Sequence, residues 1–123
     1  MQLILNEQSD IQLYKQIVQQ ITEHIARGSL RYDDTLPSAR QLASDLSINV
    51  NTVLKSYHEL VEKGLIEQQP KKKARVIAHK PTTQTMTTLE EALTPALAEA
   101  SAMGVAEHDV QQLVTNILAK WRS

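Results

Sequence analysis

The chain has 123 residues, of which 41% are apolar, which allows one compact domain or a small domain with an appendage and argues against global disorder. Cysteine is absent, which excludes disulfides, cysteine-zinc sites and thiol catalysis, and the lack of phenylalanine leaves a core of Leu, Ile, Val and Ala. The net charge is −1, but residues 1–80 carry 11 Lys and Arg against 9 Asp and Glu, whereas residues 81–123 carry 2 against 5. The front part of the chain, residues 1–80, is therefore basic, and the rear part, residues 81–123, is acidic. This split indicates that the two parts have different functions.

The N-terminal stretch MQLILNEQSD has no basic segment followed by a long apolar run, so it is not expected to be a signal peptide. No later apolar run approaches the length of a membrane span. We therefore expect a cytoplasmic protein without a membrane partner.

Helical spacing of apolar residues predicts a first helix over about residues 10–27, capped by Ser9 or Asp10 and ended by Gly28. Its apolar face comprises Leu13, Ile17, Val18, Ile21 and Ile25.

Two further helices follow a polar connector. Ser38 and Gln41 form the capping box of a short second helix, and Asn49 caps a third helix that runs to Lys63 and ends at Gly64. The residues expected in the core are Leu42, Ala43 and Leu46 from the second helix, and Val53, Tyr57, Leu60 and Val61 from the third.

Two short strands, 65–68 and 75–78, are expected around the loop 69–74, whose sequence is QPKKKA. Three helices followed by a β-hairpin is the order of a winged helix-turn-helix, here residues 1–78. The fold class is therefore mainly α with a small β-hairpin. Any single lysine of the loop is compatible with a merely solvated position, but as a group the lysines lie at the tip of the wing, where they can contact phosphates.

Residues 79–88 are expected to form a polar linker, with Thr88 and Glu91 as a second capping box. Two helices should follow in residues 89–123, separated by Gly104, with the second at about 106–121. Pro95 either kinks the first of them, which we favour, or starts a fresh helix.

The two rear helices are too short to form a core alone, so they must pack on the front domain, on a second copy, or on both. Trp121 is a natural interface anchor, although covering the first helix of its own chain would explain it equally well. We expect a homodimer with an interface formed by Leu93, Leu97, Val110, Leu113, Val114, Ile117, Leu118 and Trp121.

The start of the third helix carries the candidate base contacts, because this part of a helix-turn-helix enters the major groove. Asparagine pairs with adenine through two hydrogen bonds, and threonine contacts a base, a phosphate or a thymine methyl group. Arg40 either reaches the groove edge or pairs with a nearby acid such as Asp45. The expected DNA-binding residues are Arg40, Asn49, Asn51, Thr52, Lys55, Lys71, Lys72, Lys73 and Arg75.

The span IARGSL…LPSARQLASDLSINVNTVLKSYHELVEKGLI resembles the DNA-binding domain of GntR-family bacterial transcription regulators over about residues 11–78. The resemblance implies operator contacts at Arg40, Asn49, Asn51 and Thr52. This chain departs from the family at Val50, where many members carry arginine or proline. It departs again in the wing, where PKKKARV replaces a glycine turn and makes lysine contacts to phosphates the expected substitute.

The short rear segment resembles the YtrA-type subfamily of that family. This resemblance implies a homodimer and repression of a nearby transporter operon. A dimer also matches a palindromic operator in double-stranded DNA. Whether a small-molecule effector exists stays open.

An enzyme is not expected, because the four histidines are scattered and neither a nucleophile elbow nor a phosphate loop is present. No metal or cofactor is expected either. The alternative to a regulator is a winged helix that docks onto protein or RNA without operator specificity.

Overall fold

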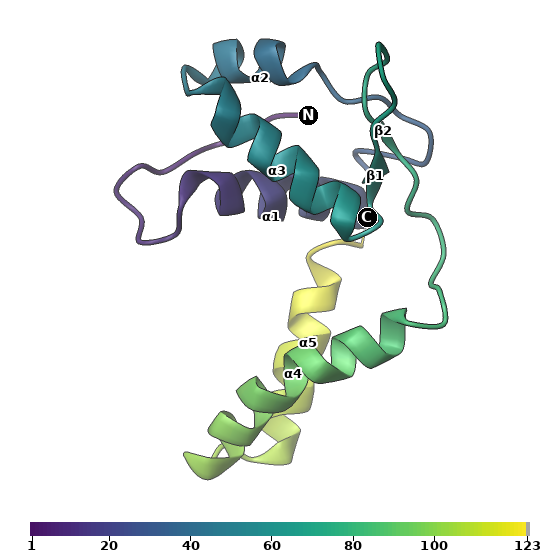
Figure 1. Cartoon of the computed structure of the whole chain (residues 1–123). Coiled ribbons are helices and arrows are strands. Elements are labelled where there is room, and N and C mark those ends of the chain that lie inside the picture. Colours follow the sequence, from purple (N-terminus) through teal and green to yellow (C-terminus); the bar gives the residue numbers. More distant parts are fainter. Residues whose placement is uncertain (123) are drawn as a thin grey trace. The chain divides into compact units, whose positions relative to one another are not determined.

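The computed structural model describes residues 1–122, and the chain divides into two compact units, the first Met1–His79 and the second beginning at Lys80. The fold class expected from the sequence is confirmed: five helices accompany one antiparallel pair of strands (Figure 1). The elements of the first unit are α1 (Leu13–Ala26), α2 (Ala39–Leu46), α3 (Val50–Glu62), β1 (Ile66–Glu67) and β2 (Arg75–Val76). Those of the second are α4 (Thr85–Ala102) and α5 (Glu107–Ala119).

The core of the first unit forms where α3 packs against both α1 and α2. Ile17 and Ile21 of α1 and Val53 and Leu60 of α3 are fully buried there. Val61 was expected in the same stripe, and this prediction is wrong because its side chain is 38% exposed. It follows Leu60 directly and therefore points about 100° further around the helix.

Local side-chain hydrogen bonds set the starts of α2 and α3, but not of α1. The Ser38 Oγ accepts the N–H of Gln41 at 3.1 Å, as predicted. The reciprocal half of the capping box is absent, because the Gln41 amide donates to Asp45 at 2.7 Å instead. The caps predicted for α1 are wrong: this helix begins after Gln12, and the Ser9 hydroxyl accepts the N–H of Ile11 before the helix starts.

An extended N-terminal arm, residues 1–6, is held along α1 by side chains spaced one helical turn apart. The Gln20 amide accepts the N–H of Ile4 at 2.8 Å and donates to its carbonyl oxygen at 2.6 Å. Gln16 makes the same pair of bonds with Asn6, both at 2.9 Å. The His24 Nε2 lies 2.8 Å from the carbonyl oxygen of Gln2. Three helix positions thus bind alternate residues of the arm, much as a neighbouring strand would.

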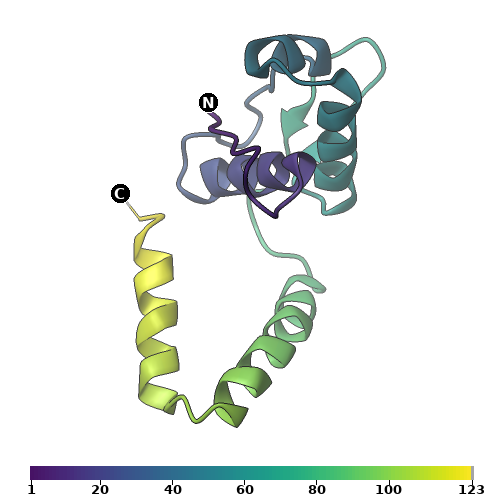
Figure 2. The same cartoon turned by 90° about the vertical axis from the view of Figure 1, so that its left-hand side faces the viewer.

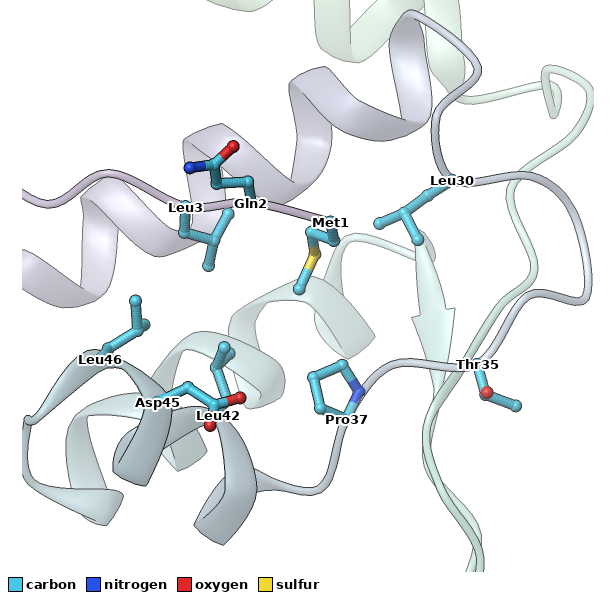
Figure 3. A pocket seen from close by; sticks show the side chains of 9 residues that line it. All are labelled: Met1, Gln2, Leu3, Leu30, Thr35, Pro37, Leu42, Asp45 and Leu46. Atoms are coloured by element: carbon cyan, nitrogen blue, oxygen red, sulfur yellow. The ribbon is translucent and has the colours of Figure 1, made fainter.

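The arm also covers α2. In Figure 3 the side chains of Met1 and Leu3 face Leu42 and Leu46 across a cavity of about 420 Å³. Leu3 and Leu5 pack against the buried core. The arm therefore adds apolar contacts to the helix that supports α3.

The connector between α1 and α2 forms an additional edge of the hairpin. The N–H of Asp33 donates to the Val76 carbonyl, and the N–H of Val76 donates to the Asp34 carbonyl, both at 2.8 Å. Thr35 forms a bridge with Arg75. β1 and β2 pair as Ile66 with Val76, so the strands are shorter than the predicted four residues each. The structure thus places the connector beside β2.

Tyr57 ties α3 to the segment before α2. Its hydroxyl donates to the Pro37 carbonyl oxygen at 2.7 Å, and burial raises the pKa of this phenol above its usual value.

We expect Tyr57→Phe to lower the free energy of unfolding by about 1 kcal/mol, because the Pro37 carbonyl loses its partner. Urea denaturation followed by circular dichroism measures this change. The wild-type protein should also lose stability as the pH rises above about 10, because the unfolded tyrosine ionises before the folded one. Tyr14→Phe is the control, and equal losses in both variants would contradict the assigned role of the Tyr57 hydroxyl.

In the second unit, α4 and α5 are joined by a turn at Gly104, whose φ is +88°. The two helices diverge from this turn (Figure 2). α4 passes through Pro95 as one helix, which confirms the preferred alternative. The capping box predicted at Thr88 and Glu91 is wrong: α4 begins at Thr85, and the N–H of Thr88 donates to the Gln84 carbonyl inside the first turn. Neither helix contains a buried residue.

None of the helices within residues 1–122 combines the length and the apolarity that a bilayer crossing needs.

Candidate DNA-binding surface

A hollow of about 580 Å³ lies between the start of α2, one side of α3 and the hairpin loop. Figure 1 shows α2 and the hairpin loop at the same end of this unit, with α3 running from the end of α2 toward the strands. The lining residues are Ser38, Ala39, Arg40, Val50, Leu54, Gln68, Lys71, Lys72, Lys73 and Ala74. We refer to this surface as the basic hollow.

Four cationic side chains line the basic hollow, and no carboxylate does. Arg40 and the three loop lysines are exposed, and none of them forms an ion pair within residues 1–122. The alternative pairing of Arg40 with Asp45 is not observed among the ion pairs of residues 1–122, and Asp45 accepts a hydrogen bond from Gln41. The surface thus presents concentrated positive charge to an anionic partner.

The lysines stand on an ordered turn. The Gln69 carbonyl accepts the N–H of Lys72 at 3.2 Å, and Lys71 has a φ of +63°, so Pro70 and Lys71 take the central positions of a type II turn. The Gln68 amide closes the turn by donating to the Lys72 carbonyl at 2.8 Å. A lysine therefore occupies a left-handed position that glycine adopts more easily.

Lys71→Gly should raise the free energy of unfolding by about 0.5 kcal/mol by relieving the left-handed conformation. It should also weaken binding to every DNA duplex alike, because one positive charge is lost. Lys72→Gly is the matched control: it removes the same charge where no positive φ exists, so it should destabilise the protein. Thermal denaturation and fluorescence anisotropy measure the two effects, and a destabilised Lys71→Gly variant would contradict the turn assignment.

The first turn of α3 presents polar side chains beside the basic hollow. The Asn49 side chain accepts the N–H of Asn51 at 2.7 Å and so caps the helix. The side chain of Asn51 is exposed and makes no hydrogen bond within residues 1–122, which leaves its amide available to a base edge. Thr52 is half-buried, and its carbonyl accepts the Ser56 hydroxyl at 2.9 Å.

Two of the predicted DNA contacts, Lys55 and Arg75, lie neither in the lining of the basic hollow nor at the start of α3 beside it. The Lys55 Nζ is 4.0 Å from the centre of the Tyr14 ring, which places this cation on the α1 side of α3. Arg75 forms ion pairs with Asp33 at 2.7 Å and Glu67 at 2.9 Å. Its guanidinium therefore links the connector between α1 and α2 to the hairpin.

Sequence reasoning missed Leu54 and Gln68, which also line the basic hollow. Leu54 does not share the buried stripe of α3. An apolar residue that breaks the helical spacing of the core residues is the sequence signal that could have identified Leu54 as part of a binding surface. Gln68 closes the turn through its hydrogen bond to the Lys72 carbonyl, which the sequence alone does not predict.

A three-helix unit with a hairpin, whose third helix borders a cationic hollow, defines a winged helix-turn-helix protein of the DNA-binding class. Residues 13–76 match the family described as bacterial regulatory proteins, gntR family. The chain belongs to this family of DNA-binding transcription regulators, and the protein is therefore a regulator and not an enzyme.

Similar proteins extend the likeness beyond the winged unit. The transcriptional repressor YtrA of Bacillus subtilis is 31% identical over 118 residues, which cover 94% of this chain and 91% of that protein. A solved structure of YtrA from Sulfolobus acidocaldarius, a GntR-family transcription factor, is 38% identical in sequence and superimposes with a TM-score of 0.66. The match covers 78% of this chain and 97% of that one. A transcriptional antiterminator from Listeria monocytogenes has a TM-score of 0.84 at 24% identity, covering 95% and 90%, which shows a shared fold.

Proposed function

We propose that the protein is a dimeric repressor that binds a palindromic operator through α3 and the hairpin loop. The observation that carries this proposal is the basic hollow, where unpaired cations flank the exposed start of α3. Cations on a wing hold phosphates and set the position of the protein, whereas side chains at the start of α3 reach the bases. Repression is inferred from the name of the B. subtilis relative.

Self-association is supported by the second unit. Leu89, Leu93 and Leu97 follow one another at intervals of four residues on α4, beside a hollow of about 330 Å³, and each is at least 38% exposed. On α5, Leu113 is 58% exposed and Leu118 is 42% exposed. Two helices with such faces and no buried residue gain most of their stability by packing against another copy.

The remaining residues of the proposed interface are also at least partly exposed in the single chain. Val110, Ile117 and Trp121 are half-buried within α5 and its end, and Val114 is 41% exposed. We propose Trp121 as an anchor of the dimer, with residues 1–78 as the DNA-binding domain. Because α4 begins at Thr85, the predicted linker 79–88 shortens to 79–84, and the proposed dimerisation segment, predicted as 89–123, begins at Thr85.

A two-fold dimer presents two α3 helices, so the half-sites should lie about one turn of DNA or a multiple of it apart. Binding to chromosomal DNA would place the protein in the cytoplasm, and the regulated operon is proposed to encode a transporter.

Selection of bound fragments from sheared genomic DNA tests this function directly. The proposal requires enrichment of fragments that share an inverted repeat, located upstream of the controlled genes. Enrichment of unrelated fragments in proportion to their length would contradict operator binding. Capture of RNA in preference to duplex DNA would favour the docking alternative.

A further inference from the structure

Two apolar side chains lie among the cations of the basic hollow. Val50 and Leu54 are one turn apart on α3, and both line this surface together with Arg40 and the loop lysines. Val50 is half-buried and packs against the core. Leu54 is 50% exposed. A partner that covers this leucine would remove apolar surface from water, which favours binding.

The partner must satisfy apolar and cationic groups at the same time. A DNA duplex does so, because its phosphates match Arg40 and the lysines while its major groove presents one apolar group, the C5 methyl of thymine. Guanine is recognised chiefly by arginine or lysine side chains that donate two hydrogen bonds, and neither Val50 nor Leu54 can donate any.

We propose that Val50 and Leu54 contact thymine methyl groups in the major groove, so that each operator half-site requires thymine at the base pairs facing this turn of α3. Asn51, whose amide suits adenine, borders the same turn and favours A·T pairs as well. This inference rests on the proposed function, because it names the bases that the operator must contain.

Selection with two DNA libraries tests the inference. One library contains thymidine, and the other contains deoxyuridine in its place, which keeps every hydrogen-bonding group and lacks only the methyl. The first library should yield an inverted repeat with an invariant thymine in each half-site. Loss of that preference with the deoxyuridine library supports the proposal. Recovery of the same repeat from both libraries, with equal affinity, overturns it and leaves the proposed function intact. Recovery of no repeat from either library overturns both.

Single substitutions in the selected duplex then measure the contact. Replacing one thymine by deoxyuridine should weaken binding about fourfold, since each methyl group that leaves an apolar contact costs roughly the free energy of burying one CH₂. Replacing both symmetry-related thymines should weaken it about 15-fold. Unchanged affinity at every thymine overturns the proposal without requiring any protein variant.

The protein side has a matched pair of variants. Leu54→Ala should no longer discriminate thymine from deoxyuridine at the base pair that faces residue 54, because that methyl loses its contact, whereas discrimination at the base pair facing Val50 should remain. Val61→Ala removes an apolar side chain of similar exposure on the same helix that does not line the basic hollow, and it should retain full discrimination. Discrimination that persists at every thymine in Leu54→Ala overturns the assignment of this residue.

Discussion

Leu113→Glu is expected to convert the protein into monomers and to weaken binding to the palindromic duplex about a hundredfold or more. Leu113 is 58% exposed in the single chain, so a carboxylate there remains hydrated in the monomer and leaves α5 folded. In a dimer the same carboxylate would be buried against apolar side chains without a partner, at a cost of several kcal/mol. Loss of one half-site contact then removes the avidity of the dimer.

Sedimentation velocity measures the association state of this variant, and circular dichroism checks that α5 persists. Gln112→Glu is the matched control, because it adds the same charge to an exposed position of the same helix on the side away from the apolar stripe. The control should remain dimeric. An intact dimer in Leu113→Glu would contradict the proposed interface, and monomers in both variants would indicate a charge effect that does not depend on position.

Asn51→Ala should cost about 1–3 kcal/mol of operator binding and relax base preference at one position of each half-site. The reason is geometric: Asn51 lies in the first turn of α3, and its side chain has no hydrogen-bonding partner within residues 1–122. Its loss should leave the stability of the fold nearly unchanged, because the cap uses the Asn49 side chain and only the backbone of residue 51.

Competition binding with a set of single-base variants of the operator measures this effect. Lys72→Ala is the comparison, since a phosphate contact should weaken all duplexes alike. A changed base preference in Lys72→Ala, or an unchanged one in Asn51→Ala, would contradict the division of labour between α3 and the hairpin loop.

Periodic and local signals made most of the fold predictable. The apolar spacing of α1 and α3 and the Ser38 and Asn49 caps depend on residues within a few positions of one another, and the structure contains each of them. The continuity of α4 through Pro95 was also favoured from the apolar spacing on both sides of the proline. The start of α4 was misplaced because several threonines in 82–88 can serve equally as caps.

Contacts between distant residues could not be predicted in the same way. The arm is fixed to α1 by glutamines whose spacing is also typical of an ordinary polar face, so nothing in the sequence distinguishes the two. Arg75 counts as one more cation in the sequence, and only its ion pairs with Asp33 and Glu67 reveal a structural role. Likewise, the sequence places Lys55 on the exposed side of α3 with Asn51, but it does not predict that the Lys55 ammonium group lies over the ring of Tyr14.

Sequence-specific DNA binding by the basic hollow and the start of α3 can be tested by a salt titration. The affinity of the protein for its selected duplex and for a scrambled duplex is measured by fluorescence anisotropy across a range of salt concentrations. We predict that log K falls linearly with log salt for both duplexes and that the selected duplex stays far tighter at physiological salt. Replacing Lys71, Lys72 and Lys73 by alanine removes six cations from the bound dimer and should make the slope shallower by about 5. A flat response to salt, or equal affinity for the two duplexes at physiological salt, would contradict sequence-specific DNA binding by this surface.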